Sequence, residues 1–122
     1  MKLRIRDDAL RLRLSRGDVR QLAEVGAVEA AMPVAPGVVF RTALRAADVP
    51  RLGVEADGLG LTILVPREWT RGWESDDRVG FEGAQDAGDG RALAITVEKE
   101  FDCLHRSADA SDTFPRPDAP TG

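Results

Sequence analysis

Cysteine, tyrosine and long apolar runs are all scarce or absent in this chain. The only cysteine is Cys103, so no disulfide can form within the chain and a core must hold the fold. There are two Trp, four Phe and no Tyr, too few rings for an extended stacking surface on single-stranded nucleic acid. No apolar run reaches the roughly 18 residues of a membrane-spanning helix, and the first residues do not resemble a signal peptide. We therefore expect a cytoplasmic protein without a membrane partner.

Positive charge is concentrated at the start of the chain. The formal net charge is −4, yet residues 1–20 carry seven Lys or Arg against three Asp. The remaining residues carry ten Lys or Arg against eighteen Asp or Glu. Such asymmetry can mark a surface that faces a polyanion, but an exposed strand face also requires polar side chains. Both interpretations are open.

A β-hairpin is predicted where this positive charge lies. Residues 2–6 alternate strictly between charged and apolar side chains, as half-buried strands do, and residues 9–14 alternate again from Leu10 onward. Asp7-Asp8 between them suits a two-residue turn. That turn sets a register in which Leu3 faces Leu12, and all apolar side chains of the hairpin then share one face.

The other face of this basic hairpin carries only positive charge. Its register places Arg4 opposite Arg11 and Lys2 opposite Arg13, and like charges across a strand pair cost stability. Either a polyanion or acids from elsewhere must offset that cost, and the acidic row at 98–102 is the obvious internal source. That row could instead bind a divalent cation or act as acid and base. The candidate polyanion-binding residues are Lys2, Arg4, Arg6, Arg11 and Arg13, and the candidate counter-charges are Glu98 and Glu100.

Two stretches of the sequence follow the same pattern. Residues 9–46 and 59–101 each predict an alternating strand, a short helix, a short strand, a glycine-containing turn and a further strand. A repeated unit that cannot cover its own apolar face should pack on its copy. We expect a mainly β (α+β) fold of two tandem ββαββ units, over 1–46 and 51–101, packed as one small barrel or sandwich.

Each unit is expected to contain one short helix. Ser15 is a suitable N-cap for the first, and Gly26 a suitable C-terminal stop. Pro66 suits the first position of the second helix, which would place Trp69 and Trp73 on one face. We expect both tryptophans to pack in the core, although stacking on a ligand is an alternative.

A second hairpin and one shared core complete the predicted fold. Asp57-Gly58 is a strong turn signal and would place Val54 opposite Leu61. A short strand is expected over 77–83, and the flexible sequence at 85–90 predicts a loop. The shared core is predicted to contain Leu12, Leu14, Leu22, Leu61, Ile63, Trp69, Trp73, Val79 and Phe81. The single domain should end near residue 106, and the Asp-, Ala- and Pro-rich residues 107–122 should form a mobile tail.

No catalytic or metal-binding motif is found. Cys103 and His105 are close in sequence, but a zinc site requires three or four ligands and has them at recognised spacings. Residues two apart on a strand seldom align a base with a thiol, so a nucleophilic pair is not favoured. Gly88-Asp-Gly90 lacks the Lys and Ser/Thr that end a phosphate-binding loop. We predict no catalytic residue, no metal site, no cofactor and no enzymatic activity.

Three segments of the second unit follow one another in the order strand, turn with strand, and final strand. Leu61–Trp69 is a strand ending in Pro-Arg-Glu, Asp76–Glu82 is a turn and strand, and Leu93–Lys99 is a final strand. In this order they resemble the swapped-hairpin domain of AbrB-type transition-state regulators and MazE-like antitoxins. In that family two chains interleave such units into one small barrel, and basic residues bind DNA. The resemblance implies a pseudo-dimer within one chain.

Further patterns run through the whole chain. They are Lys-Leu-Arg-Ile-Arg at 2–6, Leu-Arg-Leu-Arg-Leu-Ser at 10–15, Val-Gly-Phe-Glu at 79–82, Val-Glu-Lys-Glu-Phe at 97–101 and Phe-Pro-Arg-Pro at 114–117. With them the chain resembles a family of small uncharacterised bacterial proteins. That resemblance implies no chemistry.

Together these features predict a non-enzymatic binding or interaction module. We expect a monomer whose main partner is another protein. The alternative is an AbrB-like DNA-binding regulator or antitoxin-like protein that contacts phosphates through the basic hairpin. An enzyme with an unrecognised site is a third possibility.

Overall fold

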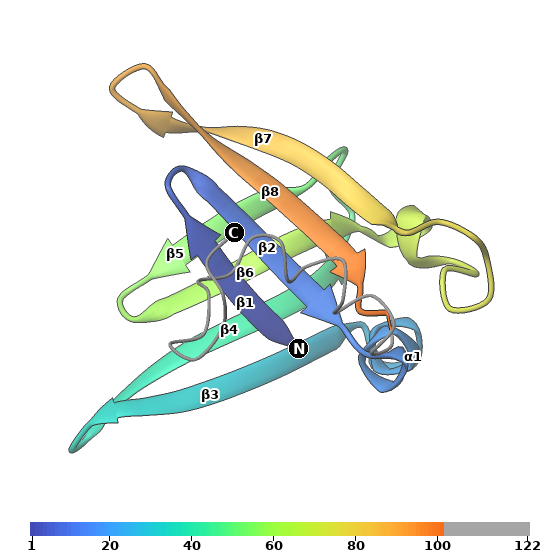
Figure 1. Ribbon diagram of the computed structural model, residues 1–122, viewed down its shortest axis with the longest axis horizontal. Helices are drawn as coiled ribbons and strands as arrows, with labels where there is room; N and C mark the ends of the chain where they lie inside the picture. The colour runs from blue at the N-terminus through green and yellow to red at the C-terminus, as the bar shows by residue number, and fades with distance from the viewer. Residues whose placement is uncertain (102–122) are drawn as a thin grey trace, which may run out of the picture.

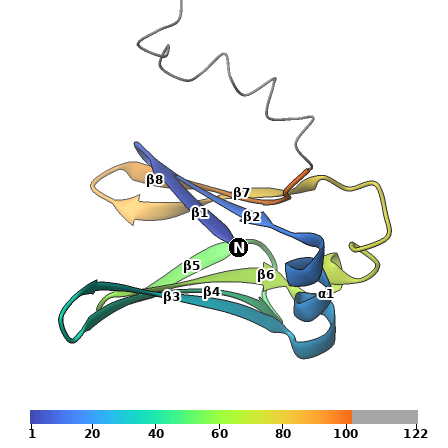
Figure 2. The same cartoon turned by 60° about the horizontal axis from the view of Figure 1, so that its bottom comes forward.

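Residues 1–101 form two layers of β-sheet with one α-helix at one end, as a computed structural model of the chain describes (Figure 1, Figure 2). The strands are β1 (Lys2–Arg6), β2 (Ala9–Leu14), β3 (Ala27–Ala35), β4 (Val38–Ala47), β5 (Gly53–Asp57), β6 (Gly60–Pro66), β7 (Gly80–Gly88) and β8 (Arg91–Lys99). Helix α1 (Arg16–Val25) follows β2, and the 3-10 turn η1 (Arg67–Thr70) follows β6. The expectations for Cys103, His105 and the tail lie outside the described residues.

The strands form two separate four-stranded sheets. The first sheet has the order β1-β2-β8-β7 and the second has the order β3-β4-β6-β5. Each sheet joins two antiparallel hairpins through one parallel pair at its centre, β2 with β8 or β4 with β6. Figure 2 shows the sheets as two layers facing one another. The mainly β prediction is therefore confirmed, but the strands of residues 1–101 do not close into a barrel.

The two sheets have corresponding registers. Leu12 of β2 pairs with Val97 of β8, and Ile63 of β6 pairs with Leu44 of β4. All four side chains are fully buried. The hairpins β3–β4 and β7–β8 each have a register shift just before a two-residue turn. The paired residues of one sheet therefore have counterparts in the other, and Leu12 corresponds to Ile63.

The basic hairpin has the predicted register, whereas the second hairpin is shifted. Leu3 pairs with Leu12 as expected. Val54, however, pairs with Ile63 rather than Leu61, and the turn is Gly58-Leu59. Gly58 has φ 56° and occupies the first central position, where a two-residue turn of this kind requires positive φ. Because the shift is two residues, each side chain stays on its predicted face.

Helix α1 begins and ends as predicted. The hydroxyl of Ser15 accepts a hydrogen bond from the Asp18 backbone, and the Asp18 carboxylate accepts one from the Ser15 backbone. Gly26 has φ 89° and donates its N–H to the carbonyl of Leu22, which closes the helix. Local capping chemistry thus determines both ends of α1.

The second predicted helix is reduced to the single turn η1. Gly72 has φ 69°, a left-handed conformation that interrupts a helix. The two tryptophans nevertheless pack together on Phe81, with ring centroids 5.4 Å away for Trp69 and 4.7 Å away for Trp73. The fully buried Trp73 also donates its indole N–H to the carbonyl of Arg78 at 2.9 Å. Packing of the tryptophans in the core is confirmed, although the helix is not.

The predicted loop at 85–90 is wrong. Strand β7 begins at Gly80 rather than residue 77 and continues through Gly88. The turn is only Asp89-Gly90, with φ values of 53° and 73°. The antiparallel ladder with β8 overrides the weak strand preference of the Gly- and Asp-rich sequence, because β propensity depends mainly on context.

One core lies between the two sheets and beneath α1. Its buried members include Leu12, Leu14, Val19, Leu22, Val28, Leu44, Leu52, Ile63, Val65, Trp73, Ile95 and Val97. Of the other predicted core residues, Leu61, Trp69 and Phe81 are half-buried. Val79 is 52% exposed and lies just before the first residue of β7, so its predicted place in the core is wrong. Within this described part, no helix is long and apolar enough to cross a membrane.

Candidate functional site

The predicted polyanion-binding residues share one face of the first sheet. Lys2, Arg4 and Arg6 alternate along β1 with the half-buried Leu3, and β2 alternates in the same way. The register sets Arg4 against Arg11, as the sequence predicts. The five cations therefore lie on the outward face, while the leucines point toward the core.

Acids from β8 neutralise part of this basic face. Glu98 is the register partner of Arg13, and their side chains are bonded at 3.1 Å. The same carboxylate lies 3.7 Å from Arg11. Beyond the strand end, Glu100 accepts a hydrogen bond from Lys2, which lowers the pKa of the Glu100 carboxyl. The prediction that Glu98 and Glu100 act as counter-charges is confirmed.

Arg4 differs from its neighbours on this face. Its side chain is exposed, and no ion pair within residues 1–101 involves it. On the far edge of the same sheet, β7 carries Glu82 and Asp86 at alternating positions. The outward face is thus basic along β1 and β2 and acidic toward β7. Such a face suits a partner with its own charge pattern better than a uniformly negative one.

One side of the two-layer fold is closed by a side chain. Gln85 on edge strand β7 accepts a hydrogen bond from the Val54 N–H of β5 at 2.7 Å and donates one to the Val54 carbonyl at 2.9 Å. Next to it, a Cβ on Gly83 would lie only 3.1 Å from the Cβ of Leu52. The glycine therefore allows β7 to lie close against β5, and we call this edge the closed side.

The opposite side is open. A groove of about 380 Å³ lies between edge strands β1 and β3. Its apolar lining is provided mainly by Met1, Leu3, Ile5, Ala30, Met32 and Phe40. Ile5 is 62% exposed and Met32 is 56% exposed. Among residues 1–101, no hydrogen bond joins β1 to β3. We call this edge the open side and this hollow the β1–β3 groove.

The registers explain why one side closes and the other does not. Val54 and Leu3 occupy corresponding positions, and the counterpart of Gln85 is Met32. A thioether cannot donate a hydrogen bond and accepts one only weakly, so Met32 cannot bond the backbone of β1 as Gln85 bonds that of β5. In the same way, the counterpart of Gly83 is Ala30, which carries a methyl group. Two side-chain differences therefore separate the two sides.

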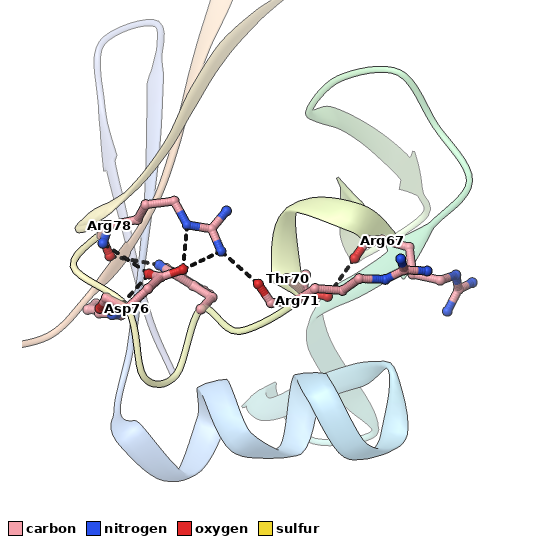
Figure 3. A network of polar contacts seen from close by, with 7 residues as sticks. Arg67, Thr70, Arg71, Asp76 and Arg78 are labelled. Carbon is pink, nitrogen blue, oxygen red and sulfur yellow. Dashed lines mark hydrogen bonds and ion pairs between the residues drawn. The ribbon is translucent and has the colours of Figure 1, made fainter.

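A polar hollow of about 610 Å³ lies between the start of α1 and the loop after η1. Asp76 is among the residues that line it, and Figure 3 shows Asp76 bonded to Arg78. The Asp76 carboxylate accepts hydrogen bonds from the backbone and side chain of Arg78, and the side-chain bond is the main cause of its lowered pKa. Arg78 also donates to the carbonyl of Arg71 at 2.9 Å. These bonds hold the loop that carries Trp73.

Metal binding has no support in the described part of the chain. Residues 1–101 contain no group of three or more His, Cys, Asp or Glu side chains close enough to hold a metal ion. In particular, Glu98 faces arginines rather than other acids. The cation-binding alternative for the acidic row is therefore not supported by Glu98 and Glu100.

Sequence reasoning missed both residues that distinguish the two sides. Gln85 falls in the predicted loop, and Met32 lies within β3 in a stretch with no marked alternation. The repeated pattern in the sequence could have revealed them. When the two stretches are aligned through their second hairpins, Gln85 corresponds to Met32.

Comparison with known proteins adds a family but no activity. No curated protein and no solved structure matches this chain. The AbrB-like resemblance of the second unit accordingly has no support from these comparisons. Over residues 1–118, however, the chain matches the model described as a family of unknown function (DUF7009), and it therefore belongs to that family.

Proposed function

We propose that this chain is a non-enzymatic binding module that holds a segment of another protein in the β1–β3 groove. The observation that carries the proposal is the contrast between the two sides of the fold. The closed side is completed by Gln85, whereas the corresponding side leaves Ile5 and Met32 exposed. Contiguous exposed apolar surface of this kind commonly marks an interaction site. A partner that covers it would gain roughly 25 cal/mol for each Å² of apolar surface removed from water.

The use of the charged side chains favours binding over catalysis. Asp76 and Glu98 are each held by basic side chains. A carboxylate with a lowered pKa, such as Asp76, is a weak general base near neutral pH. These groups are suited to fixing the fold around a binding surface.

We also propose that the fold consists of two tandem ββαββ units, over 1–46 and 51–101, arranged as an AbrB-like pseudo-dimer. The matching registers of the two sheets support this interpretation. The first hairpin of each unit shares a sheet with the second hairpin of the other unit, as in an interleaved dimer. The turn η1 then stands where α1 stands in the first unit.

Crosslinking in native cells tests the proposed function. Met32→Glu places a charge in the groove and should abolish capture of the natural protein partner. Leu59→Glu is the matched control, because Leu59 is 55% exposed in the β5–β6 turn and away from the groove. A partner identified with the wild type and the control but lost with Met32→Glu supports the proposal. A partner captured equally by all three proteins contradicts it.

A nucleic-acid-binding regulator is the second candidate function. It is favoured by one observation, the exposed Arg4 without an ion pair in residues 1–101. If the basic hairpin contacts duplex phosphates, the log of affinity should fall with log salt by about 0.9 per contact, or about 3.6 for four contacts. We expect no detectable binding of labelled duplex DNA, because Glu100 pairs with Lys2 and Glu98 is shared by Arg11 and Arg13. Tight binding that weakens steeply with salt would favour the regulator instead.

A further inference from the structure

We infer that the partner binds as an additional β-strand along β1 and that its bound segment alternates apolar and acidic side chains. This inference rests on the proposed function and specifies the chemistry of the segment that fills the groove. Three features of β1 support it: the outward backbone groups of Leu3 and Ile5, its apolar inner face and its basic outer face.

Within residues 1–101, the backbone of Leu3 and Ile5 in β1 offers hydrogen-bonding groups to the open side. In a hairpin with a two-residue turn, the pair that flanks the turn is hydrogen-bonded, and alternate pairs along the ladder are not. Arg6 and Ala9 flank the turn, so Leu3 and Ile5 direct their N–H and C=O groups away from β2. Within residues 1–101, neither of these two residues has a backbone hydrogen bond outside the sheet.

The closed side shows how such groups are used in this fold. Val54 corresponds to Leu3, and the same rule directs its N–H and C=O away from β6. Both groups are taken by the side chain of Gln85. A strand added to β1 would supply to Leu3 and Ile5 the hydrogen bonds that Gln85 supplies to Val54.

The other edge strand of the groove is protected against strand addition. Pro33 in β3 has no N–H, and the register of β3 shifts between Pro33 and Ala35. Proline and bulges are the features that block pairing at sheet edges. The partner strand is therefore expected on β1, with its inward side chains over Met32 and Phe40.

The two faces of β1 determine the sequence of the added strand. Its inward side chains would enter the apolar groove beside Leu3 and Ile5. Its outward side chains would lie on the basic face of β1 that carries Arg4, so acids are favoured there by cross-strand pairing. The same charges oppose a second copy, because an antiparallel β1–β1 pair would set arginine against arginine.

Short synthetic peptides test this inference by fluorescence anisotropy on the full chain. The probe is a labelled peptide of about six residues that alternates Val and Glu, the usual length of a strand. One control replaces each Glu with Lys, and another keeps the composition but groups the Val residues together. We expect the alternating Val/Glu peptide to bind at least about tenfold more tightly than either control, because only it matches both faces. Equal binding of the Glu and Lys peptides would overturn the inference.

Two variants locate the peptide on β1. Ile5→Pro removes an outward N–H without removing a donor of the β1–β2 ladder and should abolish binding, whereas Ile5→Val should bind normally. Because a proline can also disturb folding, Arg4→Glu provides an independent test. This substitution should lower the affinity for the Val/Glu peptide about tenfold and raise the affinity for the Val/Lys peptide about tenfold. If the Arg4→Glu variant still binds the Val/Glu peptide more tightly than the Val/Lys peptide, the acidic side chains of the peptide do not lie beside Arg4.

The remaining outcomes separate this inference from the proposed function. If Met32→Glu loses the natural partner but no alternating peptide binds, the groove is a binding site and the added strand is wrong. If a synthetic peptide of residues 102–118 binds the groove, the occupant is a segment of this chain and the inference is overturned. A dimer that dissociates on Met32→Glu would identify the occupant as a second copy, with the same consequence.

Discussion

The closed and open sides of this fold are built from corresponding strands but differ in what completes them. On the closed side, Gln85 bonds both backbone groups of Val54. On the open side, the corresponding residues are Met32 and Leu3, and a groove of about 380 Å³ separates the strands. The side chain at the position of Gln85 and Met32, together with Gly83 in place of Ala30, thus distinguishes an edge that is satisfied within the fold from one that is not. Substitutions can therefore either destabilise the core that both sides share or give one side the residue found on the other.

The largest effect is expected in the core that both sides share. Leu12→Ala should cost about 2–5 kcal/mol, because it removes a fully buried side chain and leaves a cavity. Ile63→Ala, at the corresponding position, should have a similar cost. Thermal and denaturant unfolding of both variants provides the measurement. Two separate transitions, one for each half of the chain, would show that the sheets do not share one core.

Opening the closed side should have the next largest effect. Gln85→Met places there the residue that the open side has. It should cost about 1–3 kcal/mol, because the half-buried N–H and C=O of Val54 lose their partners. Gln85→Glu keeps the acceptor for the Val54 N–H and should cost less at a pH where the carboxyl is protonated. An unchanged midpoint of unfolding in Gln85→Met would show that the two bonds do not hold the closed side.

Closing the open side is the converse substitution. Met32→Gln should allow an amide to reach the backbone of Leu3 and to stabilise the fold by about 0.5–1.5 kcal/mol. The same change should weaken binding of the alternating Val/Glu peptide, since it occupies the hydrogen-bonding groups of β1. Met32→Leu is the control that keeps an apolar side chain. A gain in stability without any loss of peptide binding would show that the peptide does not use the backbone groups that the new amide occupies.

The smallest effect concerns pH. The hydrogen bond from Lys2 lowers the pKa of Glu100 below its ordinary value of 4.5, so the folded chain favours the ionised carboxylate. Its contribution is therefore fully present above about pH 4.5 and is lost as the pH falls through the lower, folded-state pKa. Melting temperatures measured between pH 7 and pH 3 should decline less steeply in Glu100→Gln. Identical curves would show that the pair adds nothing to stability.

Local chemistry made several elements of this fold predictable. The strict alternation of residues 2–14 determined the register of the basic hairpin, because only one pairing places all apolar side chains on one face. Ser15 and Gly26 determined the ends of α1 through caps made by neighbouring residues. The counter-charges at Glu98 and Glu100 also followed from sequence, since opposite charges on one sheet face attract.

Other features were mispredicted where the deciding contacts are distant in sequence. The strand at 85–88 exists because β8 pairs with it, although its own residues favour a turn. The second helix, by contrast, is interrupted locally at Gly72, and the tryptophans pack on Phe81 from η1 and the turn that follows it. Only in the first case did tertiary pairing override local preference.

The sequence by itself determined a mainly β chain with a basic first hairpin, a capped helix and a repeated pattern. Only the tertiary structure decided that the strands form two separate sheets and that these sheets have one closed and one open side. The physical reason is that a side chain satisfies an edge strand only where the fold brings the two together. Gln85 and Val54 are far apart in sequence, so only the folded chain shows that they bond and that Met32 and Leu3 do not.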